Sequence, residues 1–446
     1  MKKWLTALAL GMALTLAQAA DTDTAAAQAQ AQKADATAQA SGFKIRPVDD
    51  AWRAALPRNA EAATQAYMDR LPAEVVAKSD AYYTGGYWLQ LWDLLLGLAV
   101  AVLMMSGGRA ARVRDWAMRV GKGPVRRDML VGAVYVAAST VLTLPLAVYE
   151  GWWREQAYGM STQTLQAWLG EAVLIQGFNM LLMALVVAGL YALMRRTGAR
   201  WWIWGTAGGM AVLIVIVAIS PVLIEPAFNT YKPVEDGPVK SAVLQMAHAN
   251  GVPVDNVYVF DASRQTTRVS ANVAGLFGSA AVRLNDNLLR RTSEPEIRAV
   301  MGHELGHYVM NHVAKTMAML TLVLFVGFAT VQWLLGRLLA RFASATGVSR
   351  VDDVAGLPML MAVFSVFFAL ATPINNSIMR VQEAEADQFG LNLSREPHGF
   401  AEAQLRIVEY RKADPGAVEE FIFFHHPSTR HRVYDAMRWR EAMGTP

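Results

Sequence analysis

Six long apolar runs restrict this chain to a membrane-spanning fold. As α-helices rising about 1.5 Å per residue, such runs can cross a hydrocarbon core of about 30 Å. The chain is 54% hydrophobic and only 17% charged, too apolar for an ordinary soluble protein. We predict a mostly α, polytopic membrane protein with six spans, near residues 87–105, 129–149, 172–194, 202–223, 317–338 and 357–374.

The N-terminal residues have the pattern of a targeting segment. Two lysines precede an apolar run from Trp4 to Leu16, and small residues follow. This pattern predicts a secretory signal peptide over residues 1–20, with a short uncleaved anchor as the alternative. Residues 21–50 are rich in Ala, Gln, Thr and Asp and have little to bury, so we expect a disordered tether.

Basic residues alternate between the connections that join the apolar runs. Seven lie between the first and second runs, three lie between the third and fourth, and the second connection offers only Arg154. Because lysine and arginine of short loops stay on the cytoplasmic side, residues 225–316 and 375–446 are predicted to face outward together. In a bacterial inner membrane that side is the periplasm.

The segment His303-Glu304-Leu305-Gly306-His307 says most about chemistry. Ser293 and Glu296 form the pattern of a capped helix start, and on that helix His303 and His307 share a face one turn apart. They can bind one metal ion, with Glu304 beside it. The chain has no cysteine, so imidazole and carboxylate must hold any metal. The alternative is a helix with two solvated histidines.

A second group follows the last apolar run, in a stretch that we expect to be helical. Glu383 and Asp387 are four residues apart, so Glu383 can be a third ligand while Asp387 accepts the second N–H of a ligating histidine. Glu385 points elsewhere and is interpreted as a solvated or salt-bridged carboxylate. His312 either supports the site or is simply exposed. A charged helix leaving the membrane is the alternative for the group.

HELGHYVMNH and the later EAEAD resemble the type I CAAX prenyl endopeptidases, which are integral-membrane zinc proteases. LPLAVYEGWWREQAYGMSTQT, SPVLIEPAFNTYKPVEDG and His426-Pro427 followed by Arg432 match further segments of that family in the same order. The resemblance covers about Tyr67 to Tyr434. It implies a small α+β, gluzincin-like zinc metallopeptidase unit and a large hollow among the spans. Membrane helices would then occupy residues 51–224 and 317–374, and the catalytic unit residues 225–316 and 375–446.

The resemblance also assigns roles to individual residues. One Zn²⁺ per chain would be bound by His303, His307 and Glu383. Glu304 would be the general base, and Asp387 would support a ligating histidine. The oxyanion would be stabilised by His426, with Arg432.

A looser match concerns Ser270 to Gly275, which resembles the family's substrate-holding edge strand. An extended peptide would pair there with the backbone near Asn272 and Ala274. An ordinary strand with a glycine bulge is the alternative.

Together these patterns predict a membrane zinc metalloendopeptidase. The expected partners are a peptide or protein substrate and the lipid bilayer. Nucleic acid is not expected, because the arginines flank apolar runs. The outward orientation differs from family members that trim prenylated tails in the cytosol, so membrane-associated or exported polypeptides are the favoured substrates. A transporter or assembly scaffold with a structural or inactive metal site is the alternative, with Asp93 as its weak support.

Overall fold

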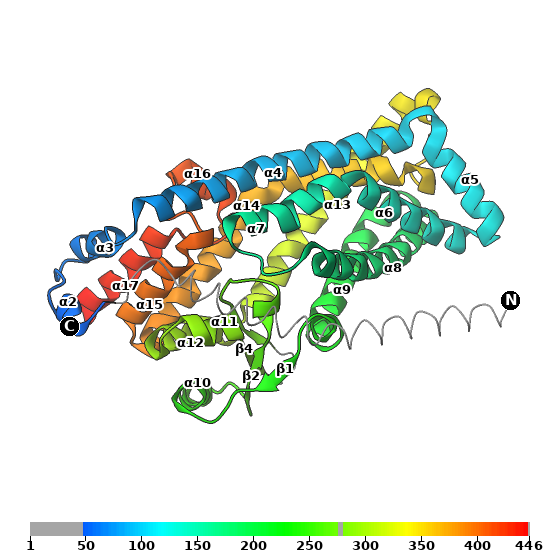
Figure 1. The fold of residues 1–446 in the computed structure, drawn as a ribbon. Helices are drawn as coiled ribbons and strands as arrows, with labels where there is room; N and C mark the ends of the chain where they lie inside the picture. The colour runs from blue at the N-terminus through cyan, green and yellow to red at the C-terminus, as the bar shows by residue number, and fades with distance from the viewer. Residues whose placement is uncertain (1–47, 275–279, 445–446) are drawn as a thin grey trace.

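The computed structural model describes residues 48–274 and 280–444. The predicted signal peptide or anchor, and all of the predicted tether up to residue 47, lie outside them. The described chain is mostly helical with one small sheet (Figure 1). This arrangement confirms the predicted fold class, a polytopic α-helical membrane protein with a small α+β unit.

Five helical segments of the described chain are long and apolar enough to cross a membrane: Ala73–Gly121, Pro124–Tyr158, Leu165–Ala227, His312–Thr346 and Val354–Ser394. The third segment contains two predicted runs, separated by the 3-10 turn η3 (Gly198–Arg200). The number of six crossings stays a prediction. The six runs lie mainly in α4 (Ala73–Met105), α6 (Pro124–Val148), α8 (Leu165–Thr197), α9 (Trp201–Ile219), α13 (His312–Thr346) and α14 (Leu357–Ser394).

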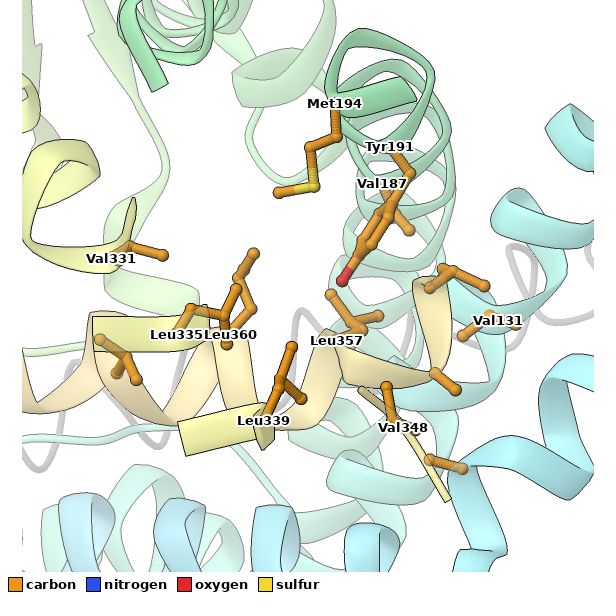
Figure 2. Close-up of a cluster of buried hydrophobic side chains, with 14 of the residues drawn as sticks. Val131, Val187, Tyr191, Met194, Val331, Leu335, Leu339, Val348, Leu357 and Leu360 are labelled. Carbon is orange, nitrogen blue, oxygen red and sulfur yellow. The ribbon is translucent and has the colours of Figure 1, made fainter. Parts of the chain in front are cut away.

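The membrane helices share one apolar core (Figure 2). Tyr191 of α8, Leu335 and Leu339 of α13, and Leu357 and Leu360 of α14 are almost fully buried in it. The outward faces of the same helices expose large apolar side chains, as expected for a surface covered by lipid. Burial therefore joins the spans, while their outer faces suit a hydrocarbon solvent.

The sheet lies outside the spans in the order β1-β2-β4-β3. The β2–β4 pair is parallel and the other two pairs are antiparallel. Val257, Val282, Leu284, Met301 and Leu305 lie in the core between the sheet and its helices. The elements of this unit are β1 (Tyr231–Pro233), α10 (Pro238–Ala249), β2 (Val257–Phe260), β3 (Ala271–Ala274), β4 (Ala281–Asn285), α11 (Asp286–Arg291) and α12 (Glu294–Val309).

The C-terminal helices complete this unit together with helices that precede the first span. Tyr67 of α3 packs in one core with Ala299 of α12, Phe400 of α15 and Val433 of α17. The segment before the first span therefore packs against the unit that contains the sheet and the C-terminal helices. The elements are α2 (Asp50–Ala54), α3 (Ala60–Met68), α15 (Pro397–Arg406), η8 (Ile407–Tyr410), α16 (Ala417–Phe423) and α17 (Thr429–Met443).

Short elements form the remaining connections. One of them, α5, links α4 to α6 at the end of the bundle away from α12 (Figure 1). The connecting elements are η1 (Ser106–Gly108), α5 (Arg109–Gly121), η2 (Tyr149–Trp153), α7 (Arg154–Tyr158), η4 (Ser220–Ile224), η5 (Glu225–Ala227), η6 (Ala262–Arg264) and η7 (Val354–Gly356).

Candidate active site

The helix α12 begins where the sequence predicts. The backbone N–H of Ser293 donates to the Glu296 carboxylate at 3.1 Å, and Pro295 occupies the first turn. Met301 and Leu305 bury one side of the helix in the core with the sheet. His303 and His307 point instead toward α14, as their mutual contacts with its carboxylates show.

Glycines allow α12 and α14 to cross closely. A Cβ on Gly302 would lie 2.9 Å from the carbonyl oxygen of Gly390, and one on Gly390 would lie 2.7 Å from the backbone nitrogen of His303. These separations are too short for any side chain, so both positions require glycine. The close crossing brings the carboxylates of α14 next to the imidazoles of α12.

The structure brings together the three side chains predicted to bind metal. Nε2 of His303 lies 3.3 Å from Oε2 of Glu383, and Nε2 of His307 lies 3.4 Å from Oε1. The two Nε2 atoms are 3.1 Å apart, and the three ligand atoms lie within 4.8 Å of one another. Oε2 of Glu383 is buried without a hydrogen bond. Two nitrogens and one buried carboxylate converging on one point fit a single ion of the zinc type.

A buried ion pair supports His303. Its Nδ1 lies 2.7 Å from Oδ1 of Asp387, the partner expected from the sequence. Arg432 binds the same carboxylate through Nε, 2.8 Å from Oδ2, and through Nη2. Burial by itself would lower the pKa of His303, but the nearby carboxylates of Asp387 and Glu383 outweigh it and raise the pKa to about 9. His303 is therefore held in one orientation by two buried charges.

A different chain of contacts supports His307. Its Nδ1 lies 2.8 Å from Nδ1 of His312, whose Nε2 lies 3.0 Å from Oε2 of Glu385. Lys315 donates to the same oxygen at 2.8 Å. Burial, together with the charge of His303, lowers the pKa of His307 to about 4. Of the two readings of His312, the structure favours the supporting one, because this side chain is buried and contacts a candidate ligand.

A cavity of about 230 Å³ adjoins one of the three candidate ligands, His303. Its lining includes His303, Glu304, His426 and Arg432. Burial, opposed by the charge on His303, raises the pKa of Glu304 to about 7. That value suits a residue that accepts and returns a proton near neutral pH.

His426 and Arg432 take different places around this cavity. Nε2 of His426 lies 3.2 Å from Oε2 of Glu383. Burial and the nearby arginines lower the pKa of His426, which keeps the imidazole neutral. Arg432 lines the cavity, but its hydrogen bonds go to Asp387, and its Nη2 lies 3.4 Å from Nδ1 of His303.

Arg411 is a residue of this site that the sequence did not predict. This side chain lines the same cavity, and its Nη1 is buried without a hydrogen-bond partner. Burial and the charge of Arg432 lower the pKa of Arg411. It follows η8 in a loop with no fixed spacing from any motif, so no sequence signal could have found it.

The strand β3 borders the cavity. In the described sheet β3 pairs only with β4, so its other edge carries no strand. Val269, Ser270 and Ala271 line the cavity, and Asn272 follows along the strand. Ala274 ends the strand, with its side chain outside the described part. The predicted edge position is present, and substrate binding at Asn272 and Ala274 stays a prediction.

A larger cavity, of about 930 Å³, lies among α6, α8 and the catalytic unit. Its membrane walls include polar side chains such as Ser139, Thr140 and Asn179. Gln265, Thr266 and Arg268 also line it, immediately before the residues that line the smaller cavity. One short segment therefore contributes to the walls of both spaces. The large hollow implied by the resemblance stays a prediction.

Comparison with known proteins identifies the family. Residues 54–230 match the family model described as the CAAX prenyl protease N-terminal region with five membrane helices, and residues 233–440 match that of peptidase family M48. An uncharacterized metalloprotease of Bacillus subtilis (strain 168), YhfN, is 30% identical over 345 residues, which cover 76% of this chain and 80% of that protein. The chain belongs to peptidase family M48.

Other relatives of this M48 protein are CAAX prenyl proteases. CAAX prenyl protease 1 of Saccharomyces cerevisiae is 27% identical over 320 residues, covering 66% of this chain and 68% of that protein. The Mus musculus homolog is 23% identical over 425 residues, covering 82% and 88%. The crystal structure of S. mikatae Ste24p shares the fold, with a TM-score of 0.71 at 20% identity over 83% of this chain and 90% of that one. The chain is thus a CAAX prenyl protease-like metalloprotease, and the transporter or scaffold alternative gains no support.

Proposed function

We propose that this M48 protein is a zinc-dependent endopeptidase that cleaves membrane-associated or exported polypeptides. The observation that carries the proposal is the convergence of His303, His307 and Glu383, whose ligand atoms lie within 4.8 Å of one another. Among the described residues, no other group of three or more potential ligands comes together in this way. Three protein ligands leave a coordination position for substrate or solvent, as a catalytic site requires.

Glu304 is proposed as the general base. Zinc, when bound, supplies a Lewis acid that acidifies water and polarises the scissile carbonyl. The Glu304 carboxylate would take a proton from the attacking water and return it to the leaving amine. Its position in the cavity beside His303, and its pKa of about 7, support both transfers.

The negative charge that develops on the carbonyl oxygen needs a hydrogen-bond donor. We assign this role to His426, which lines the cavity as a neutral imidazole and can donate an N–H. Arg432 binds Asp387, which in turn contacts His303, so we assign Arg432 a positioning role: it holds the carboxylate that orients His303. The guanidinium of Arg411, whose Nη1 is buried without a hydrogen-bond partner, adds positive charge to the same space.

The substrate would lie as an added strand on the edge of β3. Backbone pairing near Asn272 and Ala274 would present an extended peptide beside Glu304. This follows because β3 contacts α12, and because the residues just before β3 line the cavity that contains Glu304. Backbone pairing tolerates many side chains, so this mode suits a general endopeptidase.

Cleavage by matched variants tests the function. We expect Glu304→Gln to keep about one zinc per chain and to lose about 10²- to 10⁴-fold in kcat, the usual contribution of a general base. Glu235→Gln is the control, because Glu235 is exposed and away from the site. Unchanged hydrolysis by Glu304→Gln would eliminate Glu304 as the base. Farnesylated and unmodified versions of one peptide, offered to the wild type, distinguish prenyl-tail processing from general proteolysis.

The location of the active site is a separate proposal. The basic connections support an orientation with the catalytic unit in the periplasm of a bacterial inner membrane. Alkaline phosphatase fused at Pro233 should then be active and the fusion at Gly123 inactive. Activity only at Gly123 would reverse the topology.

A further inference from the structure

The end of the molecule opposite the candidate active site carries surplus positive charge. We call residues 106–128, 195–200 and 347–356 the arginine-rich end. They hold eleven arginine or lysine residues and four aspartates, a net formal charge of +7, whereas the whole chain has +4. Figure 1 shows α5 at this end and α12, α15 and α17 at the other. The positive charge is therefore concentrated in one place.

Four of these basic residues are neutralised internally. Each is paired with one or two of the four aspartates, and two of the pairs, Arg114 with Asp353 and Arg195 with Asp128, join different connections. They are Arg114 with Asp115 (2.8 Å) and Asp353, Arg127 and Arg195 with the buried Asp128 (2.8 and 2.7 Å), and Arg350 with Asp352 (2.8 Å). All four aspartates of the arginine-rich end are therefore already paired with these four arginines.

The other seven basic residues make up the whole surplus. All seven are exposed, and none forms a salt bridge with any residue in the described ranges. They are Arg109, Arg112, Arg119, Lys122, Arg126, Arg196 and Arg200. Folding thus places a set of cations without carboxylate partners on one surface, although Arg109 and Arg112 donate to backbone carbonyls.

Apolar side chains lie among these cations on α5. Ala110 and Ala117 bury one face of the helix, while Trp116 and Val120, one turn apart, are 41% and 55% exposed. Arg112 and Arg119 flank Trp116 at helical spacings of four and three residues. A basic helix with an exposed tryptophan is typical of the membrane interface, where cations meet headgroups and the ring meets acyl chains. A free phosphate would use only the cations.

We propose that the arginine-rich end binds the headgroups of anionic phospholipids, with α5 lying in the headgroup layer of the leaflet opposite the active site. The charge complementarity is direct, since guanidinium groups bind phosphate oxygens in pairs. The exposed Trp116 and Val120 select a lipid over a soluble anion. This binding would fix the depth of the molecule in the bilayer without involving the catalytic residues.

The affinity of the purified full-length protein for phosphatidylglycerol and phosphatidylcholine tests the proposal, with native mass spectrometry in detergent as the readout. The wild type should retain phosphatidylglycerol preferentially. Each basic residue near an anionic surface contributes about fivefold, so the triple variant Arg119→Gln, Lys122→Gln, Arg126→Gln should bind it about a hundredfold more weakly. Its melting temperature should match the wild type, because the three side chains are exposed and unpaired.

A triple variant with the same charge change is the control. Arg58→Gln, Lys232→Gln, Arg395→Gln removes three exposed basic residues elsewhere and should leave the affinity unchanged. Equal losses in both triple variants would show a net-charge effect and overturn the site. Undiminished phosphatidylglycerol binding by the first variant would also overturn it. Displacement of the lipid by glycerol phosphate at constant ionic strength would identify a soluble-anion site instead.

Discussion

The two histidines of the candidate metal site are held by different supports. His303 rests on Asp387 and Arg432, whose charges are buried inside the protein. His307 rests on His312, from which contacts pass to the half-exposed Glu385. The first support cannot be removed without stranding a buried charge, whereas the second ends at the surface. We infer that changes at the support of His303 alter both stability and zinc binding, whereas changes at the support of His307 alter mainly zinc binding.

The largest effect is expected at the buried support. Asp387→Ala leaves the guanidinium of Arg432 buried without its partner, which should cost about 3–5 kcal/mol of stability. His303 would also lose the acceptor that orients it. Thermal unfolding in detergent and zinc content measure the two losses. Asp414→Ala removes an exposed carboxylate and is the control. Wild-type stability of Asp387→Ala would show that the Arg432 charge is not isolated from solvent.

A second test acts on both supports at once by separating α12 from α14. Gly390→Ala places a Cβ against the backbone of His303, and such overpacking typically costs about 1–3 kcal/mol. We expect lower stability and weaker zinc binding together. Gly177→Ala is the matched control, because nothing lies within 4 Å of its Cβ position. Equal behaviour of the two variants would mean that the crossing is looser than the structure indicates.

At the second support, a substitution should lower zinc affinity more than it lowers the stability of the fold. His312→Ala removes the partner of His307 Nδ1, and loss of such a partner usually weakens metal binding about 10- to 100-fold. Competition with a zinc chelator measures the affinity, and the melting temperature of the metal-free protein should fall less than that of Asp387→Ala, because no buried charge loses its partner. His312→Gln, which keeps a hydrogen-bonding group, should recover part of the affinity. A metal-free protein as destabilised as Asp387→Ala would erase the contrast.

The smallest effect is expected at the outer end of that chain of contacts. Lys315→Ala removes an exposed ion pair with Glu385, and such pairs contribute about 0–1 kcal/mol. Zinc affinity should therefore change by less than about fivefold, and the difference should shrink at high salt. Chelator competition at low and high ionic strength measures both. A loss as large as that of His312→Ala would place Lys315 inside the support.

Patterns within single segments of the sequence predicted the membrane helices and much of the candidate metal site. Helical spacing placed His303 beside His307 and Glu383 one turn before Asp387, and run length gave the membrane helices. The contacts of His312 and Arg411 were not predictable, because they depend on where distant segments meet. The same limit applies to α3, whose Tyr67 packs with α15 and α17. Nothing in the spacing of Gly302 and Gly390 indicated that these two glycines would touch.

The position of the bound metal decides whether His303, His307 and Glu383 form the zinc site. Anomalous diffraction at the zinc edge, recorded for the wild type and for Glu383→Ala, locates any bound ion. We predict one zinc in the wild type, bound by Nε2 of His303, Nε2 of His307 and the Glu383 carboxylate, and a site largely emptied in the variant. A zinc found elsewhere, or held equally well without the Glu383 carboxylate, would show that these three side chains are not the zinc site.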